Sequence, residues 1–74
     1  MSTRLPAITP RKMRRVVERA GFVFHHQRGS HAYFRHKDGR WTTIPMHPGD
    51  LPRGIVRRIL KDIGLSEEEF RKLL

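Results

Sequence analysis

The chain has 74 residues, of which 16 are Lys or Arg and 7 are Asp or Glu, so its formal net charge is +9 with neutral histidines. A chain this short buries only about 60% of its unfolded surface, which excludes large multi-lobed enzymes. Cysteine is absent, which excludes disulfide frameworks, cysteine-based zinc sites and thiol catalysis. We therefore predict one domain over residues 1–74 with a polyanionic partner such as nucleic acid. No apolar run approaches membrane-spanning length, so we expect a cytoplasmic protein without a membrane partner.

A basic amphipathic helix is predicted first. Thr9 and Pro10 are typical of a helix N-cap and first helical position, and apolar residues recur at helical spacing from Met13 until Gly21. Ile8 and Met13 have the spacing of a hydrophobic staple. The remaining faces of this helix carry Arg11, Lys12, Arg14, Arg15 and Arg19, offset only by Glu18.

Three strands are predicted next, because the hydrophobic period changes to two. The first runs over residues 22–27, where Phe22, Phe24 and His26 alternate with Val23, His25 and Gln27. A turn at residues 28–30 leads to a second strand over residues 31–37. A hairpin signal at Asp38-Gly39 leads to a third over residues 40–46.

Two more helices complete the predicted order. One begins near Pro52 and ends at Gly64, with Arg53, Arg57, Arg58 and Lys61 on its outer face. Ser66 and Glu69 have the spacing of a capping box, which predicts a short third helix. The order helix, three strands, two helices predicts one antiparallel sheet with both main helices on one face, leaving the other face open.

The register of the second hairpin decides which side chains face the open side. A two-residue loop at Asp38-Gly39 mixes apolar and polar side chains, because a one-residue slip exchanges the faces. We prefer a three-residue loop with Gly39 in the left-handed bulge position, which pairs Lys37 with Trp41 and points His36 inward. The predicted buried face is Phe22, Phe24, Ala32, Phe34, Thr42, Ile44 and Met46, and the open face is His31, Tyr33, Arg35, Trp41, Thr43 and His47.

Metal-dependent nuclease chemistry is disfavoured by the distribution of acids. It needs clustered carboxylates to hold Mg²⁺, and Asp38 is the only acid between Gly21 and Gly49. The five histidines show no spacing typical of a metal-ligand set. We predict neither a metal nor another cofactor.

RNA allows cleavage without a metal, because its 2′-OH attacks the adjacent phosphate once a base removes the proton. Histidine exchanges protons near neutral pH, and arginine binds phosphate oxygens. The predicted open face places His31, Tyr33 and Arg35 beside Trp41, which combines proton transfer, base stacking and phosphate binding. The alternative interpretation is a solvated surface on which these residues only bind or pack.

The preferred register also yields a hypothesis about a second histidine. It places His31 directly opposite His47, where Cβ atoms lie about 4.5 to 5.5 Å apart, so that one phosphate fits between a base and an acid. The alternative is that pairing ends at Pro45, which cannot donate to the ladder, and that His47 begins a polar loop. We therefore treat His47 as a second candidate catalytic residue.

Several short motifs, in their order and spacing, resemble the HicA family of toxin ribonucleases from bacterial and archaeal toxin–antitoxin pairs. They lie at residues 27–31 (QRGSH), 34–36 (FRH), 38–39 (DG), 44–47 (IPMH) and 57–66 (RRILKDIGLS), and the leading helix also fits. The resemblance covers nearly the whole chain. It implies an α+β fold similar to double-stranded-RNA-binding domains, with the order α-β-β-β-α and here a short additional C-terminal helix.

The same resemblance implies an activity and partners. It implies an endoribonuclease, or mRNA interferase, that needs no known metal, acts on mRNA and is silenced by a HicB-like antitoxin protein. The catalytic histidine of the family's G-S-H motif corresponds to His31. We predict that RNA binding involves Arg11, Arg14, Arg15, Arg28, Ser30, Tyr33, Arg35, Arg57 and Lys61.

Two alternatives stay open at this point. The first is a non-catalytic double-stranded-RNA-binding module, which normally binds through its helices and a basic loop. The second is a protein whose basic surface recognises an acidic partner protein. Cleavage of single-stranded RNA by the purified protein distinguishes both from the toxin.

Overall fold

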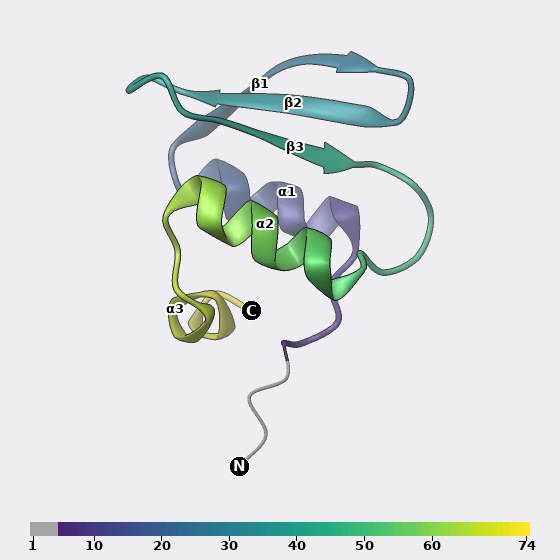
Figure 1. Ribbon diagram of the computed structural model, residues 1–74, viewed down its shortest axis with the longest axis vertical. Helices are drawn as coiled ribbons and strands as arrows, with labels where there is room; N and C mark the ends of the chain where they lie inside the picture. Colours follow the sequence, from purple (N-terminus) through teal and green to yellow (C-terminus); the bar gives the residue numbers. More distant parts are fainter. Residues whose placement is uncertain (1–4) are drawn as a thin grey trace.

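A computed structural model describes residues 5–74, so the first four residues of the predicted domain 1–74 lie outside the described part. The elements follow in the order α1 (Pro10–Arg19), β1 (Phe22–Arg28), β2 (His31–His36), β3 (Trp41–Pro45), α2 (Arg53–Ile63) and α3 (Glu67–Lys72), as Figure 1 shows. The strands form one antiparallel sheet in the order β1-β2-β3. No helix within residues 5–74 has the length and apolar character needed to cross a bilayer.

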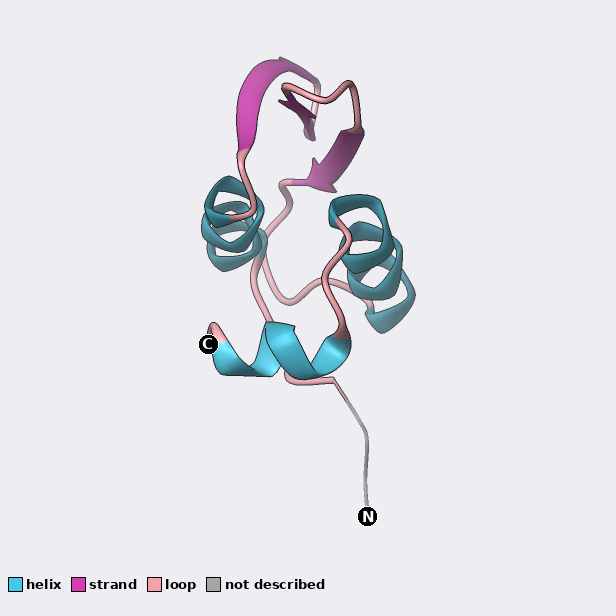
Figure 2. Cartoon of the chain, turned by 90° about the vertical axis from the view of Figure 1, so that its left-hand side faces the viewer, coloured by secondary structure: helices cyan, strands magenta, loops and turns pink. Residues whose placement is uncertain are grey.

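The layers match the predicted α+β arrangement of double-stranded-RNA-binding type. Helices α1 and α2 lie side by side against one face of the sheet, and α3 lies on their side away from the sheet (Figure 2). No described segment covers the other face of the sheet in either view. The fold therefore leaves that face free for a ligand.

The helix boundaries follow local sequence signals. The Thr9 side chain accepts a hydrogen bond from the backbone N–H of Lys12 at 3.3 Å, as expected of an N-cap. Gly64 ends α2 with φ 74°, a left-handed conformation that glycine adopts at little cost. At α3 both halves of the capping box between Ser66 and Glu69 are present, at 2.9 and 3.0 Å. Each predicted cap is confirmed.

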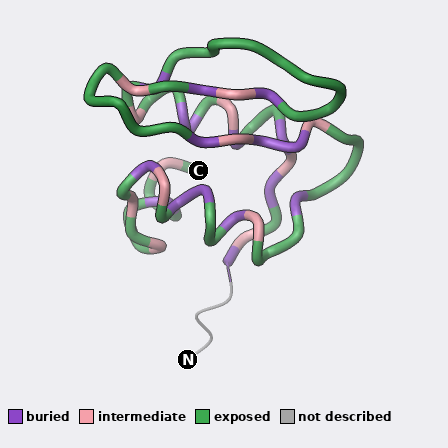
Figure 3. Tube along the Cα trace, turned by 45° about the horizontal axis from the view of Figure 1, so that its top comes forward, coloured by how far each residue is buried: buried purple, intermediate pink, exposed green. Residues whose placement is uncertain are grey.

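The hydrophobic core lies between the sheet and the helices. Figure 3 shows buried residues along β2, β3 and the helices, whereas most of β1 and the connecting turns are exposed. The prediction that Phe24 and Met46 are fully buried is wrong. Phe24 is 38% exposed, and Met46 packs against the core but is only partly buried. Phe24 lies on the edge strand β1, where its ring meets the Phe34 ring at 5.7 Å and the Arg14 guanidinium at 5.1 Å but stays partly open to solvent, and Met46 follows the end of β3. The other predicted members of the buried face are confirmed, namely Phe22, Ala32, Phe34, Thr42 and Ile44.

The hairpin between β2 and β3 is displaced by two residues from the predicted register. Arg35, rather than Lys37, pairs with Trp41. The shift is an even number of residues, so every side chain of this hairpin keeps the face that was predicted for it. Gly39 has φ 98°, which confirms the predicted left-handed position in a three-residue loop.

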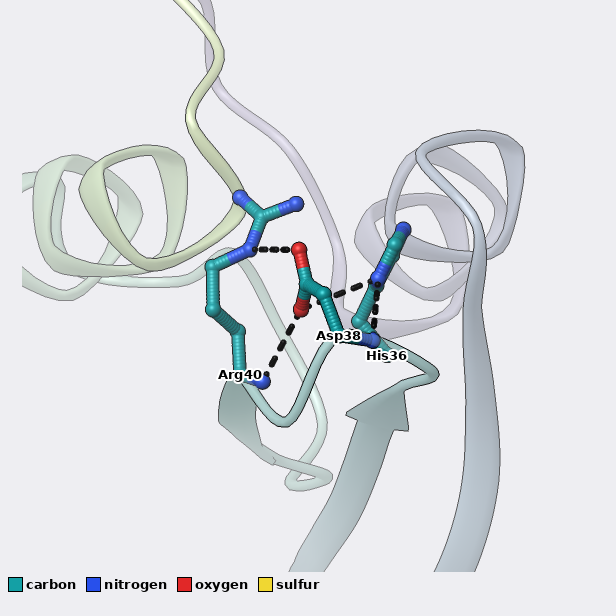
Figure 4. Close-up of polar contacts among 3 residues, drawn as sticks. All are labelled: His36, Asp38 and Arg40. Atoms are coloured by element: carbon teal, nitrogen blue, oxygen red, sulfur yellow. Dashed lines mark hydrogen bonds and ion pairs between the residues drawn. The ribbon is translucent and has the colours of Figure 1, made fainter.

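Hydrogen bonds around Asp38 explain why the turn closes earlier than predicted. The backbone N–H of His36 donates to the Arg40 carbonyl at 2.8 Å. The Asp38 carboxylate accepts from the Arg40 backbone at 3.0 Å and from its Nε at 2.9 Å, as Figure 4 shows. The backbone N–H of Arg40 lowers the pKa of the Asp38 carboxyl below its ordinary value. His36 points inward as predicted, with its ring 5.1 Å from that of Phe22.

Candidate active site and nucleic-acid interface

A bulge in β1 decides which side chains reach the open face of the sheet. Phe24 pairs with Phe34 on the buried side, but His26 pairs with Tyr33, leaving His25 as the extra residue. Beyond the bulge the alternation of faces is reversed. The prediction that His26 shares a face with Phe22 and Phe24 is therefore wrong, because His26 lies on the open face with Tyr33.

Four aromatic side chains gather on this face, and we call them the ring cluster (His25, His26, Tyr33 and Trp41). The rings of His26 and Tyr33 are stacked, with centroids 4.4 Å apart and planes 4° from parallel. The ring of His25 meets that of Trp41 edge-on at 4.8 Å, and the Nδ1 atoms of His25 and His26 are 2.8 Å apart. The guanidinium of Arg35 lies 5.6 Å from the Trp41 ring centre, a cation–π distance.

His31 is exposed at the first position of β2, and hydrogen bonds to the two residues before it fix the backbone there. In the preceding turn Gly29 has φ 54°, and the side chain of Gln27 donates to its carbonyl at 3.0 Å. The backbone N–H of Met46 donates to the Ser30 carbonyl at 2.6 Å, which ties the start of β2 to the end of β3. The backbone of His31 is therefore fixed while its ring remains accessible.

The cross-strand neighbours of His31 are Arg28 on β1 and Pro45 on β3. The predicted position of His47 directly opposite His31 is wrong, because the register is shifted by two residues. The alternative, that pairing ends at Pro45 and that His47 begins a loop, is confirmed, because His31–Pro45 is the last pair and β3 ends at Pro45. Pro45 lies on an edge strand, which tolerates its missing N–H, and beyond it the backbone N–H of Met46 donates to Ser30 in the turn before β2.

His31 and His47 nevertheless border the same cavity. It has a volume of about 450 Å³ and lies between the end of the sheet, the start of α1 and the loop before α2. Besides the two histidines and Asp50, its wall is apolar, with Pro10, Pro45, Pro48, Leu51, Pro52 and Ile55. The structure thus brings both candidate catalytic histidines to one hollow without making them a cross-strand pair.

The predicted RNA-binding residues fall into two groups. Arg28, Ser30, Tyr33 and Arg35 lie on or beside the open face, and Arg11, in the first turn of α1, borders a depression next to His47. The other four lie on the helices. Two of those already have partners within the protein: Arg14 lies over Phe24 and Phe34 and 3.3 Å from Glu18, and Arg57 lies 3.5 Å from Glu67. Arg15 and Lys61 are exposed.

The acidic residues lie away from the open face. All seven are in α1, α2, α3, the turn at Asp38 or the loop at Asp50, and none is on a strand. Within residues 5–74, no three His, Asp or Glu side chains are placed to hold a metal ion together. The open face is therefore positively charged without carboxylates of its own.

The fold and this face define a small, basic α+β protein with an exposed surface of histidines, aromatic rings and arginines. The family model for the HicA toxin of bacterial toxin–antitoxin systems matches residues 10–65. That match covers more than half of the 74 residues, so the chain belongs to the HicA toxin family and is the toxin of a toxin–antitoxin system. Toxins of this family pair with HicB antitoxins. A search of curated proteins found no match.

Proposed function

We propose that this toxin is an endoribonuclease that cleaves mRNA at the open sheet face, with His31 as the group that transfers protons. The observation that carries the proposal is the position of His31, which is exposed at the start of β2 with Arg28 directly across from it and a cavity alongside. Histidine near a cation is suited to accept a proton from a hydroxyl beside a bound phosphate.

The reaction uses only atoms of the RNA and proton transfers by the protein. His31 accepts the proton of the 2′-OH, the 2′ oxygen attacks the adjacent phosphorus, and the bond from phosphorus to the 5′ oxygen breaks. The products are a 2′,3′-cyclic phosphate and a 5′-OH, whose oxygen takes up a proton. Arg28 stabilises the negative charge that develops on the phosphate oxygens.

His47 is the group proposed to deliver the proton to the 5′ oxygen. Its support is the cavity that it shares with His31, which is wide enough to admit part of a nucleotide. Two histidines with opposite proton roles have to be in opposite protonation states, so their joint action makes the rate rise and then fall with pH.

The proposed antitoxin contact involves the same face. A HicB-like antitoxin with acidic residues silences the toxin by occupying the phosphate-binding arginines, since the face has positive charge and no carboxylate of its own. Arg35→Ala is then expected to weaken both RNA cleavage and antitoxin binding. Antitoxin affinity that stays unchanged while cleavage falls would place the inhibitory contact elsewhere.

A non-catalytic double-stranded-RNA-binding module has less support. Such modules bind through their helices, but Arg14 and Arg57 on the helical side already have carboxylate partners. The test is cleavage of single-stranded RNA by the purified toxin in the presence of EDTA, with DNA of the same sequence as control. We expect RNA to be cut to a 2′,3′-cyclic phosphate and DNA to remain intact. Binding without cleavage would favour the module.

A further inference from the structure

We infer that the ring cluster of His25, His26, Tyr33 and Trp41 binds unpaired RNA bases by stacking. The inference rests on the proposed function and deepens it, because it assigns a base-binding subsite to the face that carries His31. Such a subsite requires unpaired bases, since the bases of a duplex are stacked on one another and cannot offer their faces to a protein. The preferred substrate is therefore single-stranded RNA.

The bulge in β1 brings neighbouring residues of the ring cluster to one face of the sheet. Neighbouring residues of a regular strand point to opposite faces, so His25 and His26 would not otherwise share one. Alternation from Phe24 places His25 on the open face, and the bulge brings His26 there as well, where His26 stacks on Tyr33 and His25 contacts Trp41. Bulges commonly re-aim a side chain next to a functional site.

The aromatic surface of the ring cluster is open to solvent. Trp41 is 42% exposed, and both histidines are exposed. No described segment lies over this side of the sheet (Figure 2). Rings that are held in place by one another and remain open to solvent provide flat apolar surfaces on which any base can stack.

The positive charge of the arginines beside the ring cluster favours nucleic acid over a protein as the occupant. Arg35 lies at cation–π distance from Trp41, and Arg28 lies beside His31 on the same face. A strand of RNA places phosphates next to its bases, so arginines interleaved with rings match both of its parts. Tyr33 lies two residues from His31 along β2, about 7 Å, which is close enough for a base adjacent to the cleaved phosphate.

The test uses Trp41 as its own reporter, because it is the only tryptophan of the chain. The probes are two oligodeoxythymidylates of about eight residues, one intact and one with abasic central positions. Both have the same number of phosphates, and neither has a 2′-OH, so charge is matched and cleavage is avoided. We expect the intact probe to quench Trp41 fluorescence and to bind at least about fivefold more tightly than the abasic probe. A duplex probe should not quench.

Substitutions separate stacking from charge in the same assay, with binding followed by anisotropy of labelled probes. Trp41→Ala should reduce the preference for the intact probe to less than about twofold, whereas Trp41→Phe should keep most of it, because a ring remains. Val23→Ala is the matched control: Val23 pairs with Arg35, is 68% exposed and is not part of the cluster. It should leave the preference unchanged.

Three outcomes would overturn the inference. Equal affinity for both probes without quenching means that binding is purely electrostatic. Loss of the preference in Val23→Ala means that it does not come from the rings. Loss of antitoxin binding in Trp41→Ala with an unchanged probe preference assigns the rings to the protein partner. A toxin that prefers the intact probe but cleaves no RNA would overturn only the proposed function, whereas one that cleaves RNA but binds both probes equally would overturn only this inference.

Discussion

On the helical side of the molecule, four arginines lie within 4 Å of carboxylates, namely Arg14, Arg57, Arg58 and Arg71. Arg14 lies 3.3 Å from Glu18, and Arg58 lies 2.9 Å from Asp62 while also donating to the Thr43 carbonyl at 2.6 Å. On the open sheet face, Arg28 and Arg35 have no carboxylate partner within residues 5–74. Similar residues thus stabilise the fold on one side and remain available for a polyanion on the other. Net charge alone does not reveal which side binds RNA.

Loss of the His47 side chain is expected to have the largest effect on RNA cleavage among the following substitutions. If His47 delivers the proton to the leaving oxygen, His47→Ala should slow cleavage by about 10²-fold or more and remove one limb of a bell-shaped pH–rate profile. Single-turnover cleavage rates measured across pH provide the check. His25→Ala is a useful comparison, because that ring belongs to the ring cluster and not to the cavity wall. A His47→Ala enzyme with near wild-type rates would leave His31 as the sole catalytic histidine.

Breaking the network on the helical side should affect stability and not RNA affinity. Thr42 is 2% exposed, and its hydroxyl donates to Asp62 at 3.1 Å. Asp62→Ala leaves that hydroxyl without its partner, which should cost about 1–3 kcal/mol of unfolding free energy. Urea unfolding measures this cost, and Asp50→Ala in the exposed loop is the control. An unchanged unfolding midpoint would show that this network contributes little.

Removing one arginine from each face should change the salt dependence of RNA binding unequally. Arg35→Ala should reduce the slope of log affinity against log salt by about one, because an available cation that contacts a phosphate releases counterions. Arg57→Ala should reduce it less, since Glu67 lies 3.5 Å from that guanidinium. Titrations at several salt concentrations compare the two. Equal reductions would mean that RNA contacts both faces.

The smallest effect concerns the pH dependence of stability at α3. The backbone N–H of Ser66 donates to the Glu69 carboxylate and lowers the pKa of that carboxyl below its ordinary value. A lowered folded-state pKa adds stability above the unfolded-state value, near pH 4, and this stability is lost as the pH falls through the folded-state pKa. Glu69→Gln should therefore have a lower Tm than wild type at neutral pH and an equal Tm in strong acid. A Tm difference that is constant with pH would contradict this.

Local signals in the sequence predicted the helices and strands, whereas the register between β2 and β3 was predicted wrongly by two residues. Thr9, Gly64 and the Ser66–Glu69 box act within one turn of helix, so their effects can be read from neighbouring residues. The hairpin register depends on side-chain bonds at Asp38 that no periodicity reveals. The sheet faces were still assigned correctly in this hairpin because the error was an even number of residues.

The candidate site was predicted in part. His31, Tyr33, Arg35 and Trp41 lie on the open face as expected, but His25 and His26 were missed as members of that face. One signal for the bulge was present: unbroken alternation from Phe22 would point Arg28 into the core, where an unpaired charge is costly. The bulge avoids this cost, and it depends on pairing with β2 that lies outside the local sequence.

Cleavage of single-stranded RNA by wild type and by His31→Ala tests whether His31 is the group that transfers the proton. Both purified proteins are compared in EDTA under single-turnover conditions, with circular dichroism to establish that the variant is folded. We expect wild type to produce 2′,3′-cyclic phosphate ends and His31→Ala to lose at least about 10²-fold in rate while it still binds uncleavable DNA of the same sequence. Equal cleavage rates for the two proteins would contradict the assignment of the active site to the open face at His31.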